Sequence, residues 1–382
     1  PLKDFSFISQ TLEAKLEALQ CHFTWELNPS ESKLLLLREI LEDIGTEEGN
    51  SWLGHIYNLR GYIQYKLGFT EDSQSLFNQA TEALRLTRGA EEGPWLVVNY
   101  GNLAWLHHHL GEQEESQAYL SKVDALMKKY PSPSQDELHP EILAEIAWTL
   151  MKFSAKQRLL AAVYFERAIR TQTDMVEWNT SRVLALESAS KDPENKVEVD
   201  ILKEMEDAKK RDPENLYLAA LYLEACAKKI RFDIKEEARE LGREVLKRPV
   251  SSYSGNTPIL RLYRKNGLKD EAIELAEEAL RRHPGERFLK WSAANCYKWV
   301  LEDRKDPALQ KEIDRGISLC KEVISLYSHH SLKIKIALAN MYLLLNNQDE
   351  AEKIFVELHK IKDLEEAELK LLNINCRKIF QM

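Results

Sequence analysis

The sequence has little of what would stabilise a small secreted domain or cross a membrane. Its 382 residues include only 14 glycines, 12 prolines and five cysteines, and the cysteines lie far apart with no C-x-x-C pair. This spacing argues against a disulfide framework and predicts reduced thiols. No apolar run approaches the roughly 20 residues needed to span a bilayer, and the first residues lack the order of a signal peptide. We therefore expect a cytoplasmic protein without a membrane partner.

Motifs of catalysis and of metal binding are also missing. No H-E-x-x-H, P-loop, G-x-S-x-G or dinucleotide fingerprint occurs. The run His107–His108–His109 cannot converge on one ion, because consecutive residues of a helix diverge by about 100°. We expect no enzyme activity, no metal and no cofactor. The net charge of −9 argues against indiscriminate nucleic-acid binding, and we expect no binding of DNA.

What the sequence does have is a recurrence of small and large residues at fixed offsets. These are the packing positions of the tetratricopeptide repeat, an antiparallel helix pair with a period of about 34 residues. Such pairs stack into a superhelix with an extended concave face. The predicted fold is all-α, a right-handed solenoid of tetratricopeptide-repeat helix pairs with a basic concave channel. The recurrence runs through Gly61, Gly68, Ser73, Phe77 and Ala80, then Gly267, Ala272, Ala276, Ala279 and Pro284, then Ala339, Tyr342, Ala351 and Phe355.

The positions of proline and glycine predict where the helices begin and end. Strand-type alternation is absent over any useful length, and most prolines and glycines fall where a helix should end. We predict N-terminal helices plus two repeats in 1–130, middle repeats in 131–250 and C-terminal repeats in 251–382. Helix pairs are predicted at 55–85, 96–130, 139–172, 175–212, 215–249, 256–284, 287–328 and 331–361.

The first helix of each pair lines the inner surface of such a repeat. The positions expected to face inward carry Lys, Arg and Trp, whereas acidic residues are nearly absent from them and crowd into second helices and loops. Cations neutralise phosphates and aromatic faces stack bases at about 1–3 kcal/mol each, so this pattern favours a channel for a single-stranded nucleic acid. A tryptophan on a first helix is nevertheless more often core than a stacking platform. The inner candidates are Trp148, Lys152, Arg182, Arg261, Arg264, Trp291 and Lys298.

The segment Cys21–His22–Phe23–Thr24–Trp25, followed by tetratricopeptide repeats, resembles the interferon-induced proteins with tetratricopeptide repeats. Matches continue along nearly the whole chain. Members of that family are antiviral effectors of innate immunity rather than enzymes. The resemblance implies binding of the 5′ end of single-stranded RNA, a triphosphate or an incompletely methylated cap, and association with itself or with family members. The further matches include Gly101–Asn102, Ala147–Trp148–Thr149–Leu150–Met151–Lys152, Cys296–Tyr297–Lys298 and Leu338–Ala339–Asn340–Met341–Tyr342.

The resemblance also assigns roles to individual residues. It implies that Lys152 contacts the 5′ end of the RNA, that Trp148 stacks on the cap base, and that Arg38 and Arg264 contact phosphates. Several positions depart from the family pattern, so RNA binding is better supported than selectivity for a triphosphate. Arg158 stands where the family has a tyrosine, and it is itself a predicted phosphate contact. The other departures are Ser188 for an arginine, for which Arg182 could compensate, Trp291–Ser292 for His–Gln, Glu42 for a glutamine, and Ser331 and Lys333 for two aromatic residues.

Two other functions remain open. Tetratricopeptide arrays commonly act as protein-interaction scaffolds without RNA specificity, often through a clamp of Lys, Asn and Arg that holds a carboxylate. Asn58, Asn102 and Arg261 do not assemble such a clamp convincingly. A nucleotide hydrolase has no support, because the sequence has no phosphate loop.

Overall fold

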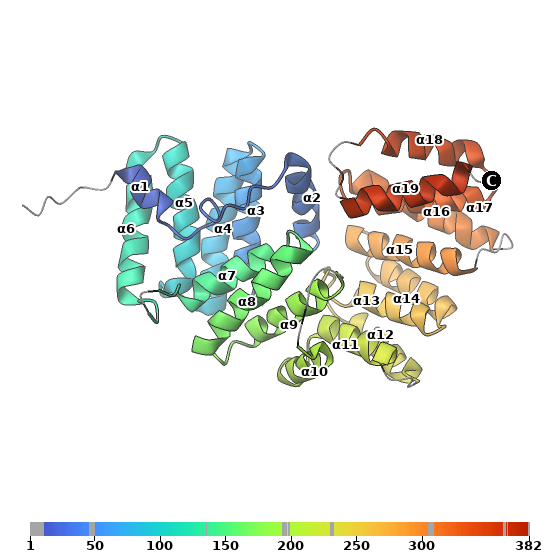
Figure 1. The fold of residues 1–382 in the computed structure, drawn as a ribbon, viewed down its shortest axis with the longest axis horizontal. Helices are drawn as coiled ribbons and strands as arrows, with labels where there is room; N and C mark the ends of the chain where they lie inside the picture. The colour runs from blue at the N-terminus through green and yellow to red at the C-terminus, as the bar shows by residue number, and fades with distance from the viewer. Residues whose placement is uncertain are drawn as a thin grey trace, which may run out of the picture. The chain divides into compact units, whose positions relative to one another are not determined.

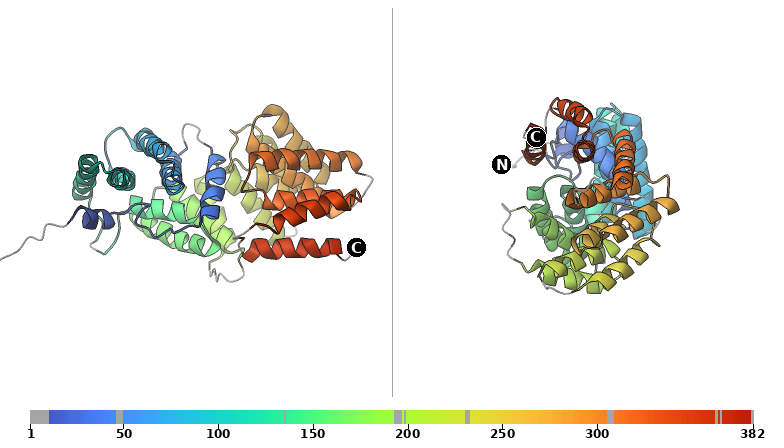
Figure 2. Two further views of the ribbon diagram at one scale, coloured as in Figure 1. Left: turned by 90° about the horizontal axis from the view of Figure 1, so that it is seen from above. Right: turned by 90° about the vertical axis from the view of Figure 1, so that its right-hand side faces the viewer.

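A computed structural model describes residues 11–45, 50–134, 136–192, 197, 199–229, 233–304, 309–361, 364 and 366–380. Within these ranges every regular element is a helix and no strand occurs. In two views, the helices of a pair lie side by side and antiparallel (Figures 1 and 2). The predicted all-α fold is confirmed.

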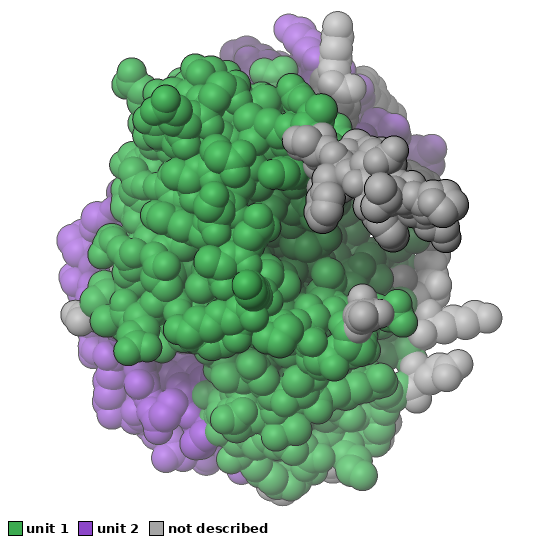
Figure 3. Space-filling view, turned by 90° about the vertical axis from the view of Figure 1, so that its left-hand side faces the viewer, with its two compact units in different colours: residues 1–38, 46–212 green, residues 39–45, 213–382 purple. Residues whose placement is uncertain are grey.

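The chain divides into two compact units, residues 1–38 with 46–212 and residues 39–45 with 213–382 (Figure 3). We call these unit 1 and unit 2. The division of the chain into three parts remains a prediction.

Among its described residues, unit 1 contains α1 (Leu12–Glu17), most of α2 (Glu31–Glu42) and four helix pairs. The pairs and the 3₁₀ turn between the first two are α3 (Leu53–Lys66) with α4 (Thr70–Arg88), η1 (Pro94–Leu96), α5 (Val97–His109) with α6 (Gln113–Lys129), α7 (Pro140–Leu150) with α8 (Ala155–Thr171), and α9 (Val176–Ala189) with α10 (Ile201–Arg211).

Unit 2 contains the end of α2, four more pairs and a last helix. Its elements are α11 (Leu216–Lys229) with α12 (Lys235–Val245), α13 (Asn256–Lys265) with α14 (Lys269–Arg282), α15 (Arg287–Arg304) with α16 (Gln310–Leu326), α17 (Leu332–Leu344) with α18 (Gln348–Leu358), and α19 (Glu366–Phe380). The predicted helix pairs are therefore confirmed to within a few residues at each end.

Four of the pairs turn in the same way. Gly68, Gly111 and Gly267 have φ values of 87°, 80° and 79°, and Asn346 has 55° in the corresponding place. A left-handed residue just after a helix lets the next backbone N–H bond back to the last turn, which satisfies a terminal carbonyl. That bond is 2.9 Å long in each case, and the donors and acceptors are Phe69 to Gln64, Glu112 to His107, Leu268 to Tyr263 and Asn347 to Tyr342. The turn is therefore fixed by one residue per pair.

The recurrent small residues pack against large ones. Gly61 lies on α3 so close to Phe77 of α4 that an added Cβ would be 2.6 Å from the ring. Phe77 and Ala80 are completely buried. In the last pair Ala339 and Ala351 are equally buried, and Phe355 is 4% exposed. The residues that predicted the repeat are thus the residues that join its two helices.

The N-terminal block Cys21–Trp25 is a core element of unit 1. The backbone N–H of His22 donates to the Asn102 side-chain oxygen at 3.1 Å, and the Asn102 amide lies 3.1 Å from His22 Nδ1. With Nδ1 as acceptor, Nε2 is left to donate to the Thr149 hydroxyl at 3.1 Å. Burial lowers the His22 pKa to about 3, so the ring is neutral. Three segments that carry the family resemblance therefore meet at one buried histidine.

Candidate functional site

A first basic cluster lies where α7 passes into α8 in unit 1. Lys152 follows the end of α7, and its ammonium lies 4.3 Å from the centroid of the Trp148 ring. Arg158, at the start of α8, donates from Nε to the Met151 carbonyl at 3.3 Å. Burial and then the charge of Arg158 lower the pKa of Lys152 to about 7. A poorly hydrated ammonium beside a second cation gains from an approaching anion.

Trp148 itself is only 3% exposed. Its ring lies nearly parallel to that of Trp52, with centroids 6.0 Å apart, and His55 packs nearby. The indole therefore forms part of the packing between helices, and its ring also contacts the Lys152 ammonium. Its stacking on a cap base remains a prediction.

Helix α2, which is about 120 residues earlier in the chain, also contacts this region. Lys33 donates from Nζ to the Phe153 carbonyl at 3.1 Å, one residue beyond Lys152. Arg38 lies farther along α2 with its guanidinium 5.9 Å from the Phe69 ring centroid. Unit 1 thus brings a segment of α2 to the turn that carries Lys152, while Arg38 lies at the turn between α3 and α4.

Arg182 is in unit 1 but has acidic partners. Its guanidinium is 2.6 Å from the Glu204 carboxylate and 3.8 Å from that of Glu166. Ser188, six residues later on α9, is partly buried. Compensation for Ser188 by Arg182 would require a phosphate to compete with these two carboxylates.

A second basic cluster lies in unit 2. The pKa of Lys298 on α15 is lowered by burial and by the charges of Lys333 on α17 and Arg264 on α13, while Glu302 acts in the opposite direction. Arg264 makes two hydrogen bonds to Asp303, at 2.9 and 3.0 Å. Two predicted phosphate contacts and Lys333 therefore share one neighbourhood.

Arg261 lies one turn before Arg264 and makes a tighter pair. It donates from Nε and Nη2 to the Glu224 carboxylate of α11, with a shortest distance of 2.7 Å. Lys265 donates to the same carboxylate at 2.5 Å. Glu224 is only 8% exposed, so the cations shield its carboxylate from solvent.

First helices nevertheless carry acidic residues. Buried or partly buried carboxylates lie on α7, α9 and α11, and burial raises the pKa of Glu145 to about 8. Asn58 donates to that carboxyl group at 2.8 Å. Sequence reasoning missed these residues because it took each helix separately, whereas their partners lie on neighbouring helices. The acidic residues concerned are Glu141, Glu145, Glu177 and Glu224.

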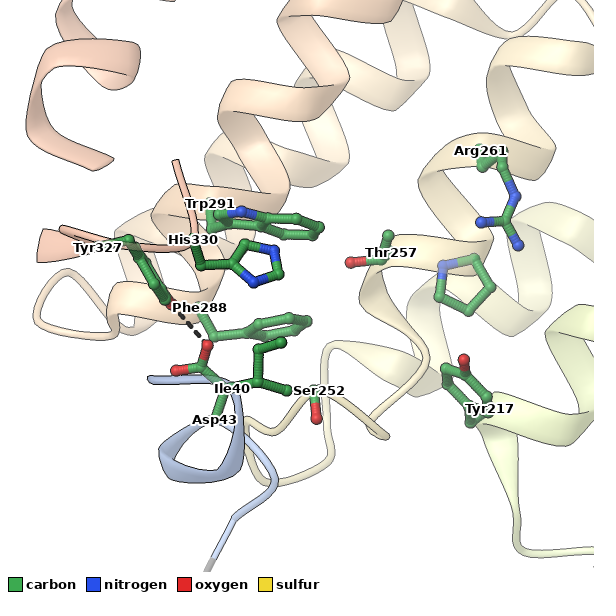
Figure 4. Close-up of a pocket in the computed structure, with 11 residues that line it drawn as sticks. Ile40, Asp43, Tyr217, Ser252, Thr257, Arg261, Phe288, Trp291, Tyr327 and His330 are labelled. Carbon is green, nitrogen blue, oxygen red and sulfur yellow. Dashed lines mark hydrogen bonds between the residues drawn. The ribbon is translucent and has the colours of Figure 1, made fainter. Parts of the chain in front are cut away.

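Unit 2 also contains an aromatic-lined pocket of about 210 Å³. Phe288 and Trp291 of α15 lie nearly parallel, with centroids 6.1 Å apart, and His330 meets the Trp291 ring edge-on at 5.6 Å. Figure 4 shows these rings gathered at one side of the pocket, with Thr257 and Arg261 at the other. Trp291, which replaces the polar pair of the family pattern, is thus a wall of this pocket.

Asp43, which follows α2, lines the pocket and accepts hydrogen bonds from two side chains of unit 2. Tyr327 donates to its carboxylate at 2.8 Å, as does Arg287. Arg287 also pairs with Glu42 at 3.0 Å, so the carboxylate that departs from the family pattern has a basic neighbour. These bonds hold the end of α2 within unit 2.

Two features of the described residues bear on other functions. No helix in the described part of the chain is long and apolar enough to cross a membrane. Among the same residues, no group of three or more His, Cys, Asp or Glu side chains is arranged to hold a metal ion.

Comparison with known proteins gives one matched repeat and relatives that match most of this chain. The family model of the tetratricopeptide repeat matches residues 98–126, which span α5 and α6. Antiviral innate immune response effector IFIT1 of Macaca fascicularis is 26% identical over 378 residues, which is 94% of this chain and 77% of that protein. Interferon-induced protein with tetratricopeptide repeats 3 of Mus musculus is 27% identical over 369 residues, 94% of this chain and 88% of that protein.

Solved structures of IFIT1 also match this chain. The chain matches a human IFIT1 dimer with PPP-AAAA at a TM-score of 0.70 and 25% identity, over 93% of this chain and 77% of that one. It matches a monomeric IFIT1 mutant with Gppp-AAAA at a TM-score of 0.75 and 24% identity, over 93% and 79%. The tetratricopeptide-repeat fold and the resemblance to the interferon-induced family are confirmed.

Proposed function

We propose that this chain, a relative of the interferon-induced proteins with tetratricopeptide repeats, is an antiviral effector that binds the 5′ end of single-stranded RNA. The ligand is a 5′-triphosphate or an incompletely methylated cap. Similarity to IFIT1 over more than nine tenths of the chain, and a solved human IFIT1 with PPP-AAAA, support this function. The protein sequesters RNA in the cytoplasm without catalysis, alone or associated with itself or with relatives.

The observation that carries the proposal is the environment of Lys152. Its ammonium is held against Trp148 and next to Arg158, and its pKa is lowered to about 7. A terminal triphosphate concentrates several negative charges at one point, and it would remove the cost of holding two cations together. Charge-assisted contacts of this kind contribute about 1.5–3 kcal/mol each.

Unit 2 carries cations and an aromatic ring of its own, which are proposed to contact RNA. Lys298, Lys333 and Arg264 supply positive charge from three helices, and Trp291 supplies a partly exposed ring at the aromatic pocket. Base–aromatic stacking tolerates any sequence because every base has a π-face. We therefore expect recognition of the RNA end rather than of its sequence.

The test compares one short single-stranded RNA with a 5′-triphosphate, a cap or a 5′-hydroxyl. Wild-type protein should prefer the triphosphate or the cap, and Lys152→Glu should weaken that binding at least tenfold, as expected for loss of a charge-assisted contact. Lys156→Glu is the matched control, because Lys156 is exposed at the start of α8; it should change affinity less than about threefold, as surface charges do.

Other results would contradict the proposal. Equal affinity for all three ends would mean a general phosphate groove. No binding to any RNA would favour a protein-interaction scaffold.

A further inference from the structure

We propose that Glu224 is a built-in competitor of RNA phosphate, which occupies Arg261 and Lys265 and so limits the affinity of unit 2 for polyanions. This inference rests on the proposed function, and it adds a residue that sets affinity and salt dependence. Glu224 of α11 and Arg261 of α13 form an ion pair between two first helices of unit 2, with side chains 8% and 27% exposed.

The geometry is that of an occupied anion site. Arg261 approaches both carboxylate oxygens, with distances of 3.1 and 2.9 Å from Nε and 2.7 Å from Nη2. Lys265, one turn later on α13, reaches Oε1 at 2.5 Å. A fork of arginine donors plus one ammonium is also how proteins hold phosphate. The Glu224 carboxylate therefore fills a place suited to a phosphate.

Glu224 stays ionised over the physiological range. Burial alone would raise its pKa, but the hydrogen bonds and charges of Arg261 and Lys265 outweigh burial and lower the pKa to about 2. The two cations and one anion leave a net charge of +1 where +2 would otherwise face a ligand. RNA must displace this carboxylate or bind a half-neutralised pair.

The cations remain within reach of a ligand although the carboxylate is enclosed. Arg261 is 27% exposed and Lys265 is 39% exposed, against 8% for Glu224. Arg261 also lines the aromatic pocket that Trp291 and Phe288 form. A nucleotide whose base enters this pocket would bring its phosphate towards the neutralised guanidinium.

Unit 2 offers a matched ion pair that should not compete with RNA. Glu277 of α14 accepts from Arg315 of α16 at 2.8 and 3.0 Å, again through two hydrogen bonds. Both residues lie on second helices, and neither lines the pocket. Glu277→Gln removes the same charge as Glu224→Gln, so it controls for the change in net charge.

The experiment measures the affinity of wild type, Glu224→Gln and Glu277→Gln for two probes, 5′-triphosphate single-stranded RNA and inorganic tripolyphosphate. We expect Glu224→Gln to bind both probes about 10- to 100-fold more tightly, as expected for one further charge-assisted contact. The salt slope for RNA should steepen by about 0.7, as for one more phosphate contact. Glu277→Gln should stay within about twofold of wild type. The double variant Glu224→Gln/Arg261→Gln should lose the gain.

The result that overturns the inference is a folded Glu224→Gln that binds neither probe more tightly than Glu277→Gln does. If Glu224→Gln does not fold, Glu224→Asp withdraws the carboxylate by one methylene and should give a smaller gain for both probes; no gain would overturn the inference. Tripolyphosphate separates this inference from the proposed function. Wild type that fails to bind RNA would refute the function, while a tripolyphosphate gain in Glu224→Gln would still support the competing carboxylate.

Discussion

At the residue scale, the fold lets the Lys152 side chain gain or lose its proton near neutral pH. Burial and the neighbouring Arg158 lower its pKa to about 7, whereas a bound phosphate would favour the protonated form. Binding of RNA should therefore take up a proton above pH 7. We expect the affinity for 5′-triphosphate RNA to fall as the pH rises from 7 to 9, by up to about tenfold per pH unit. Titration of the dissociation constant at four pH values measures this.

The control for this prediction is Lys152→Arg. A guanidinium stays protonated throughout the range, so its profile should be flat above pH 7. A terminal phosphate loses its last proton with a pKa of about 6, so the RNA is almost fully ionised above pH 7. A wild-type profile as flat as that of Lys152→Arg would show that Lys152 is not the linked group.

The sequence predicts which arginines belong to the candidate site, but it does not predict the carboxylates that pair with them. Arg182, Arg261 and Arg264 were expected from helical spacing, but their carboxylate partners were not. Those partners are 22, 37 and 39 residues away, and the last two distances are close to one repeat. A search for opposite charges one repeat apart would have found Glu224 and Asp303. Spacing within one helix cannot reveal contacts between neighbouring repeats.

At the scale of a helix pair, the small residues of the repeat are steric requirements. Gly61→Ala would place a Cβ 2.6 Å from the Phe77 ring, and that ring is fully buried. Alanine favours the helix by about 0.5–1 kcal/mol over glycine, but overpacking costs about 1–3 kcal/mol. We expect the steric cost to win and the free energy of unfolding to fall by about 1–2 kcal/mol. Thermal unfolding should show a midpoint a few degrees lower.

Gly285→Ala is the matched control for that change. An added Cβ at Gly285 meets no atom within 4 Å, and its φ lies outside the left-handed range. Its free energy of unfolding should stay within about 0.5 kcal/mol of wild type, as for a surface change. Equal effects of the two variants would mean that Gly61 is not a packing position.

The elements were predicted well where a repeat signature was present. The recurrent small residues, and the glycines and prolines at helix ends, predicted the helix pairs directly. Helix α19 was not predicted, because Glu366–Phe380 begins in an acidic run and carries none of the recurrent small residues. The Cys21–Trp25 block predicted the family but not its own role, since the contacts of His22 with Asn102 and Thr149 span 80 and 127 residues. Local sequence cannot show such distant partners.

At the scale of the whole molecule, a net charge of −9 coexists with basic clusters in both units. Non-specific attraction of RNA to an acidic body should be weak, so phosphate contacts must come from the clusters. Each phosphate contact with single-stranded RNA contributes about −0.7 to the slope of log affinity against log salt. We expect 5′-triphosphate RNA to give a steeper slope than 5′-hydroxyl RNA, and the difference should be about 0.7 to 1.4, which corresponds to one or two further phosphate contacts. Affinities between about 50 and 300 mM salt measure the difference, and equal slopes would show that the extra phosphates make no contact.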